Sequence, residues 1–156
     1  MSTFFSGALK NLAPYTPGEQ PQDQQYVKLN TNESPYPPSA GVITALNAKE
    51  ASDLRLYSDP ECKELKKALA DYYKVEPENI YVGNGSDEAL NFAFLSYATD
   101  GRGVAFADIT YGFYPVFADL YHIPVQIVPL KSDFSIAPED YYGLNKTIVI
   151  ANPNAP

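Results

Sequence analysis

The residues of this sequence best suited to chemistry lie in one turn, Gly83-Asn84-Gly85-Ser86-Asp87. The apolar run before it, Ile80-Tyr81-Val82, is typical of a buried strand. The residues after it are typical of a helix that is apolar all round and is therefore expected to be buried between layers. Ser86 is a favourable N-cap, and acids at positions 87 and 88 suit the positive end of the helix dipole. A strand, a glycine turn and a helix N-terminus gather unpaired N–H groups around an anion, usually a phosphate. The turn is thus a candidate anion site, although such turns also simply reverse the chain in α/β domains.

The turn does not belong to a nucleoside-triphosphate P-loop, because no Lys-Ser/Thr pair follows the glycines. The series Gly83, Gly85, Glu88 is similar to the dinucleotide fingerprint, but Glu88 stands where the third glycine allows a helix to pack closely on a strand. Asp108, at the end of the next apolar run, could bind a ribose. A nicotinamide- or flavin-dependent oxidoreductase therefore remains an alternative.

Two further loops share the predicted location of this turn. Asp108–Gly112 follows the predicted strand Val104–Ala107, and Asn152–Pro156 follows the predicted strand Thr147–Ala151. The carboxyl ends of parallel strands meet at one edge of a sheet, and ligands bind there. The three loops are therefore expected to line one site.

Alternating strand and helix signals predict an α/β fold with a parallel or mixed sheet. One predicted helix starts with Asp59 as N-cap and Pro60 at its first position and runs to about Lys74. Its inward side chains are expected to be Leu65, Leu69, Tyr72 and Tyr73. The other predicted elements are helices over 39–49, from Ser86 onward and over 113–121, and strands over 26–29, 80–82, 104–107, 124–129 and 147–151.

The composition excludes several classes of function. The net charge of −8 argues against binding to nucleic acid or to an anionic membrane. The single cysteine cannot form an internal disulfide, and a lone histidine, His122, leaves no zinc cluster. The first residues lack a basic signal-peptide region, so a cytoplasmic location is expected.

The polar loop over 29–38 contains three prolines, together with Asn32 and Glu33. Proline stiffens such a backbone, so these two side chains could make fixed contacts with a substrate. From the residues alone, a rigid connector is the favoured interpretation.

Five motifs occur in the order and approximate spacing of a known family. They are LNTNESP (29–35), LRLYSDP (54–60), VGNGSDEAL (82–90), ITYGFYP (109–115) and ANPNAP (151–156). The sequence from about Pro14 onward resembles histidinol-phosphate aminotransferases, which are pyridoxal 5'-phosphate enzymes of the aspartate aminotransferase fold. The resemblance implies an N-terminal arm and small-domain segment over 1–46. It implies that 47–156 is the first, incomplete part of the cofactor-binding large domain, with a mainly parallel sheet flanked by helices.

The resemblance also implies roles for single residues. The turn Gly85-Ser86-Asp87 would hold the cofactor phosphate through backbone amides, and Tyr111 would stack on the pyridine ring. Tyr57 would reach the phosphate bound by the neighbouring subunit, so that active sites form in a homodimer. Tyr15, Asn32 and Glu33 would line the substrate side. The asparagine that commonly bonds the cofactor's ring oxygen is Ala155 here, and Asn154 is the candidate substitute.

The Schiff-base lysine of the family, and the aspartate that pairs with the pyridine nitrogen, both lie beyond the ANPNAP motif. No lysine of this chain matches the motif, so no catalytic residue is assigned here. The chain is expected to be an N-terminal fragment that is inactive alone. The complete protein is expected to transfer an amino group between L-histidinol phosphate and 2-oxoglutarate in histidine biosynthesis. Three alternative functions stay open: an aromatic aminotransferase, a threonine-phosphate decarboxylase and a non-catalytic binding module.

Overall fold

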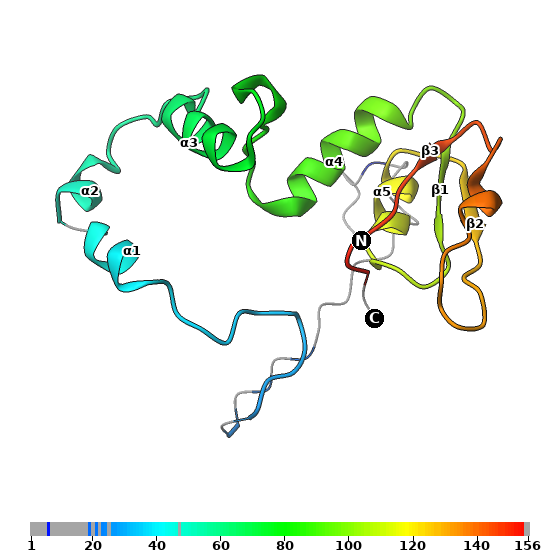
Figure 1. Cartoon of the computed structure of the whole chain (residues 1–156), viewed down its shortest axis with the longest axis horizontal. Helices are drawn as coiled ribbons and strands as arrows, with labels where there is room; N and C mark the ends of the chain where they lie inside the picture. Colours follow the sequence, from blue (N-terminus) through cyan, green and yellow to red (C-terminus); the bar gives the residue numbers. More distant parts are fainter. Residues whose placement is uncertain are drawn as a thin grey trace. The chain divides into compact units, whose positions relative to one another are not determined.

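The computed structural model describes residues 6, 19, 21, 23–24, 26–46 and 48–154. The described residues from 19 onward fall into two compact units: one within 16–82, called the unit up to Val82, and one from Gly83 onward, called the unit after Val82 (Figure 1). The predicted boundary at residues 46/47 refers to domains of the complete protein and stays a prediction. Among the described residues, no helix is both long and apolar enough to cross a bilayer.

The unit after Val82 is built on a three-stranded parallel sheet in the order β2-β1-β3. Its elements are α4 (Gly85–Tyr97), β1 (Val104–Ala107), α5 (Tyr114–Leu120), β2 (Val125–Val128), a 3₁₀ helix (Pro138–Tyr141) and β3 (Thr147–Ile148). In the register, Val104 lies opposite Val125 on one side and Thr147 on the other. The predicted α/β fold with a parallel sheet is therefore confirmed.

The central strand β1 is buried along its whole length, as a parallel strand with both faces covered must be. Successive side chains point to opposite faces, and the core is divided accordingly. Val104 and Phe106 pack with Phe94 of α4 and Phe117 of α5. Ala105 packs with Val128 and Tyr141 on the opposite face. The two helices thus cover one face of the sheet, as Figure 1 shows.

Local signals explain where α5 and α4 begin. Pro115 lies in the first turn of α5, where a missing N–H breaks no helical hydrogen bond. α4 begins at Gly85 with Asn84 as N-cap, so the prediction of Ser86 as N-cap was wrong by two residues. Instead of a side chain at the N-cap, Glu88 reaches back and accepts a hydrogen bond from the Asn84 amide at 2.7 Å.

Two predictions about the region around α4 were wrong. Residues 80–82 form no strand, and the sheet in the described part of the chain consists of β2, β1 and β3. α4 was expected to be buried all round, yet Phe92, Leu95 and Tyr97 are exposed while Phe94 is 2% exposed. Only the α4 face that meets β1 and α5 is covered.

The unit up to Val82 contains α1 (Ala40–Ala45), α2 (Ala48–Asp53), α3 (Lys63–Tyr73) and a 3₁₀ helix (Pro77–Asn79). The predicted helix over 39–49 therefore stops at Ala45, and the weak strand predicted over 26–29 is absent. α3 begins at Lys63 with Cys62 as N-cap, so the prediction of Asp59 as N-cap and Pro60 as the first helical residue was wrong by three residues. The Asp59 carboxylate nevertheless accepts a hydrogen bond from the Lys63 amide at 2.8 Å. The predicted inward face of α3 was wrong in part, because Leu65, Tyr72 and Tyr73 are exposed.

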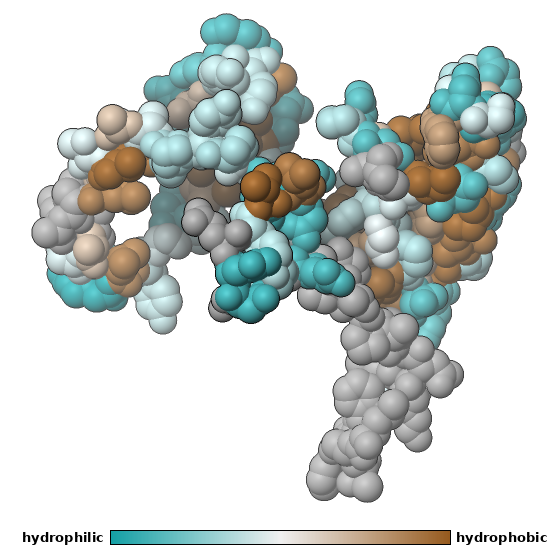
Figure 2. Space-filling view, turned by 90° about the horizontal axis from the view of Figure 1, so that it is seen from below, coloured by the Kyte–Doolittle hydropathy of each residue, from teal (hydrophilic) through white to brown (hydrophobic). Residues whose placement is uncertain are grey.

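Both units expose large apolar side chains, which Figure 2 shows as brown areas on the visible surface. On the unit after Val82 they include Phe92, Leu95, Tyr97, Val125, Ile127, Ile148 and Ile150. Contiguous exposed apolar surface marks regions that bind other protein segments.

We predict that Tyr141→Phe leaves the chain equally stable or stabilises it. Tyr141 is 6% exposed, and its hydroxyl has no hydrogen-bond partner among the described residues. Burial, with the nearby carboxylates of Asp140 and Asp108, raises the pKa of this phenol. A buried unpaired polar atom costs about 1–3 kcal/mol, which phenylalanine avoids. Urea unfolding measures the change.

The matched control is Tyr121→Phe, because the Tyr121 hydroxyl donates to Asn91 Oδ1 at 2.7 Å. This change should lower the free energy of unfolding by about 0.5–1.5 kcal/mol. Destabilisation by Tyr141→Phe equal to that of the control would show that the Tyr141 hydroxyl is paired.

Candidate cofactor site

The candidate site lies where three loops meet in the unit after Val82. These are the turn that opens α4, the loop after β1 and the loop after β3. The hydroxyl of Tyr111, in the loop after β1, donates to Asp87 Oδ1 in the first turn of α4 at 2.8 Å. Asn154, after β3, donates from Nδ2 to the Ile109 carbonyl at 2.9 Å and accepts from Thr110 Oγ1 at 2.8 Å. The three predicted loops therefore do come together.

The N-terminus of α4 offers donors to an anion. The first amides of a helix have no intrahelical acceptor. Here the Asn84 amide donates to Glu88 and the Gly85 amide to the Gly83 carbonyl, which leaves Ser86 and Asp87 as the next donors in the turn. Gly85 has φ +81°, and a Cβ built on it would meet nothing within 4 Å. The turn is thus open on the glycine side, as an approach by a phosphate requires.

Tyr111 is half-buried and has its ring among aromatic neighbours. The ring centroid lies 5.5 Å from that of Tyr114 in an edge arrangement and 6.3 Å from that of Phe113. Tyr114 is buried, and its burial raises the pKa of its phenol. The hydroxyl bond to Asp87 and these ring contacts together give Tyr111 a defined place beside the α4 turn.

Asp108 is not placed to play the ribose-binding role that the sequence suggested for it. Its Oδ1 accepts from the Ile109 amide at 3.0 Å and from the Leu130 amide at 3.0 Å. This carboxylate therefore ties the loop after β1 to the segment that follows β2, and Asp108 is a structural residue of the loop. The dinucleotide interpretation loses its acidic partner.

Three other predicted site residues, Asn32, Glu33 and Tyr57, belong to the unit up to Val82. Glu33 pairs with Lys28 at 2.7 Å, and the hydrogen bond from Lys28 lowers the pKa of the Glu33 carboxyl. Asn32 has φ +53° in the same turn and is exposed. Tyr57 lies between α2 and α3 with its side chain fully exposed. Tyr15 and Ala155 lie outside the described residues.

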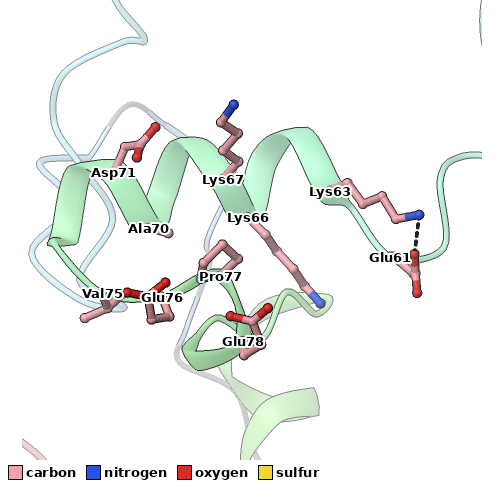
Figure 3. Close-up of a pocket in the computed structure, with 10 residues that line it drawn as sticks. All are labelled: Glu61, Lys63, Lys66, Lys67, Ala70, Asp71, Val75, Glu76, Pro77 and Glu78. Carbon is pink, nitrogen blue, oxygen red and sulfur yellow. Dashed lines mark ion pairs between the residues drawn. The ribbon is translucent and has the colours of Figure 1, made fainter.

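A cavity of about 670 Å³ also lies in this unit, between α3 and the 3₁₀ helix (Figure 3). Its charged lining includes Lys63, Lys66 and Lys67 but also Glu61, Asp71, Glu76 and Glu78. Lys63 is paired with Glu61 at 2.6 Å, and Lys67 points away from the 3₁₀ helix. The mixed charge selects neither an anion nor a cation, and no predicted site residue lines this cavity. Among the described residues, no group of His, Cys, Asp and Glu is arranged to hold a metal ion.

Sequence reasoning missed Thr110, whose hydroxyl bonds the Asn154 side chain. No local signal could have revealed it, because the two residues are 44 positions apart and meet only through the pairing of β1 with β3.

Known proteins are similar to this chain over most of its length. Residues 24–156 match the family described as aminotransferase class I and II. Proteins named histidinol-phosphate aminotransferase are similar over the whole chain: 52% identical in a Marinomonas species, 48% in Clostridium acetobutylicum and 49% in Brachyspira hyodysenteriae. The chain spans 44% of the length of each of these three relatives. By the match over residues 24–156, this chain belongs to the class I and II aminotransferases.

Proposed function

We propose that this chain is the N-terminal part of a pyridoxal-phosphate-dependent transaminase. The complete protein would exchange an amino group between L-histidinol phosphate and 2-oxoglutarate. The observation that carries the cofactor assignment is the 2.8 Å contact between Tyr111 and Asp87, which brings an aromatic ring to an open helix N-terminus. The substrate assignment is supported by relatives named histidinol-phosphate aminotransferase at 46–52% identity.

In this proposal, Gly85, Ser86 and Asp87 hold the cofactor phosphate. The Ser86 and Asp87 amides donate to it, and the helix dipole favours its charge. Hydrogen bonds to a charged acceptor contribute about 1.5–3 kcal/mol each, so two of them anchor the group firmly. Gly85 keeps the approach free of a side chain, in agreement with its open surroundings.

Tyr111 would orient the pyridine ring by stacking, and its bond to Asp87 keeps the tyrosine ring in place. When bound, pyridoxal phosphate supplies an electron sink and carries the amino group. The lysine that anchors the cofactor covalently would come from residues beyond this chain. The described part of the chain would therefore bind and orient the cofactor, and residues outside it would transfer the protons.

The substrate side and the assembly complete the proposal. Tyr15, Asn32 and Glu33 would contact the substrate, and Tyr57 would reach the phosphate in the partner subunit of a cytoplasmic homodimer. The exposed Tyr57 side chain agrees with a role at such a boundary. Residues 1–46 would belong to the arm and small domain, and 47–156 to the large domain.

A substrate comparison with the complete protein tests the proposed function. L-Histidinol phosphate and 2-oxoglutarate should react with a kcat/KM at least about 100-fold above that for aromatic amino acids, since buried polar groups discriminate strongly. Threonine phosphate should not be decarboxylated. A preference for an aromatic amino acid or for threonine phosphate would replace the proposed substrate, and a nicotinamide-dependent activity would refute the transaminase itself.

We predict that Tyr111→Ala in the complete protein weakens cofactor binding about 2–10-fold, because aromatic stacking contributes about 0.5–1.5 kcal/mol beyond area burial. Tyr111→Phe keeps the ring and should lose much less. Equilibrium dialysis and the visible spectrum of the bound cofactor measure both effects. Equal losses in the two variants would assign the role to the hydroxyl, and no loss in either would make Tyr111 a packing residue only.

We also predict that the 156-residue chain alone forms no specific covalent adduct with pyridoxal phosphate. No lysine in it matches the family motif, so borohydride reduction should give only sparse, scattered labelling. Peptide mapping by mass spectrometry checks this, with the complete protein as control, where one lysine outside this chain should be labelled. Stoichiometric labelling of a single lysine within the chain would contradict the assignment.

A further inference from the structure

The loop that carries Tyr111 is held from three directions. Asp108 ties the start of the loop to the Leu130 amide, two residues after β2, and the Tyr111 hydroxyl ties its end to Asp87. The third tie is the side chain of Asn154, which bonds both the Ile109 carbonyl and the Thr110 hydroxyl. All of these partners belong to the unit after Val82.

The orientation of the Asn154 amide is determined by its partners. The Ile109 carbonyl can only accept, so the atom 2.9 Å from it must be the donating Nδ2. The opposite end, Oδ1, then faces the Thr110 hydroxyl at 2.8 Å and accepts from it. An asparagine side chain has two N–H donors and a carbonyl oxygen with two lone pairs, and the loop takes one N–H and one lone pair.

We propose that Thr110 and Asn154 form a latch that fixes the ring of Tyr111 at the cofactor site. Asn154 is in this view a positioning residue, which acts on the cofactor through the loop Ile109–Tyr111. The inference rests on the proposed cofactor site and extends it to Thr110. Both residues of the latch are half-buried, so their bonds are less exposed to competition by water than surface bonds.

Substitutions at Thr110 test the latch without altering Asn154. In the complete protein, Thr110→Val has nearly the same shape but cannot donate, and Thr110→Ser keeps the hydroxyl. Thr110→Val should raise the dissociation constant for pyridoxal phosphate about 3–10-fold and change the circular dichroism of the bound cofactor, as expected for one lost hydrogen bond. Thr110→Ser should restore both values close to those of the unchanged protein.

A second readout needs no cofactor. In the protein without pyridoxal phosphate, hydrogen exchange of the backbone amides over 108–112 should be faster in Thr110→Val than in Thr110→Ser. Thermal unfolding of both variants shows whether the fold persists. If Thr110→Val fails to fold, Thr110→Ala replaces it, since alanine also lacks the hydroxyl that donates to Asn154. Faster exchange over 108–112 in Thr110→Ala than in Thr110→Ser supports the latch, and equal exchange in the two variants overturns it.

A double-mutant cycle separates the latch from direct contact of Asn154 with the cofactor. If the latch is correct, Thr110→Val adds little to the loss caused by Asn154→Ala, because both remove the same interaction. The latch is overturned if Thr110→Val has the same cofactor affinity, circular dichroism and hydrogen exchange as the wild-type protein. It is also overturned if the losses of cofactor affinity in Thr110→Val and Asn154→Ala are additive. If the wild-type complete protein does not bind pyridoxal phosphate, the proposed function is refuted instead. Hydrogen exchange alone then shows whether the Thr110–Asn154 bond orders the loop.

Discussion

Gly103→Ala should lower the free energy of unfolding by about 3–5 kcal/mol, from strain in the left-handed region and from overpacking. Gly103 has φ +83°, and a Cβ built on it would lie 2.3 Å from the Pro124 carbonyl oxygen. That oxygen accepts from the Val104 amide at 2.9 Å, and the Gly103 carbonyl accepts from the Thr147 amide at 3.1 Å. The backbone cannot move away from the new methyl group without breaking the start of the sheet on both sides of β1.

Gly101→Ala is the matched control for this effect. Gly101 has φ +91°, but a Cβ there would meet nothing within 4 Å. It should therefore show backbone strain alone, about 1–2 kcal/mol. Urea unfolding of both variants gives the difference, which isolates the contact with Pro124. Equal effects at the two positions would mean that the clash is relieved by a shift that leaves the sheet intact.

In the complete protein, we expect two inactive variants to recover activity when they are mixed, because Tyr57 is proposed to act in the active site of the partner subunit. Two inactive variants are mixed, one with Tyr57→Ala and one without the lysine that anchors the cofactor. If Tyr57 serves the opposite subunit, a mixed dimer places both defects in one site and leaves the other site intact. Random exchange of subunits then restores about a quarter of the full activity, since half of the dimers are mixed and each has one intact site.

The chain offers a control for Tyr57 in Tyr72, another exposed tyrosine of the same unit. Tyr72→Ala should keep its activity, so that the loss in Tyr57→Ala is not a general consequence of removing a surface aromatic side chain. No recovery on mixing, with subunit exchange confirmed by mass spectrometry, would place Tyr57 in the site of its own chain and end the proposal of shared sites.

The sequence by itself determined the elements of the sheet and the nature of the α4 turn. The short apolar runs at 104–107 and 124–129 predicted β1 and β2. β1 is buried on both faces, as its continuous apolar run indicates, whereas Val128 is the one buried residue of β2. Pro115 correctly predicted the first turn of α5, and the turn Gly83–Asp87 predicted where α4 begins to within two residues. Both helix starts depend on the backbone conformation of only a few residues. Tyr111 was identified only through the resemblance to the aminotransferase family.

Tertiary structure decided which of these residues meet. Asp87 and Tyr111 are 24 positions apart, and Thr110 and Asn154 are 44 apart. The Thr110–Asn154 contact depends on β3 pairing with β1 rather than with β2, and the Asp87–Tyr111 contact depends on the packing of α4 against β1 and α5. For the same reason, the apolar pattern of α4 and α3 could not reveal which side chains are covered, because burial depends on the neighbours that a helix acquires. Asp108 is the clearest case. Its position directly after β1 suggested that it binds a ribose, but its carboxylate accepts a hydrogen bond from the Leu130 amide and so holds the loop in place.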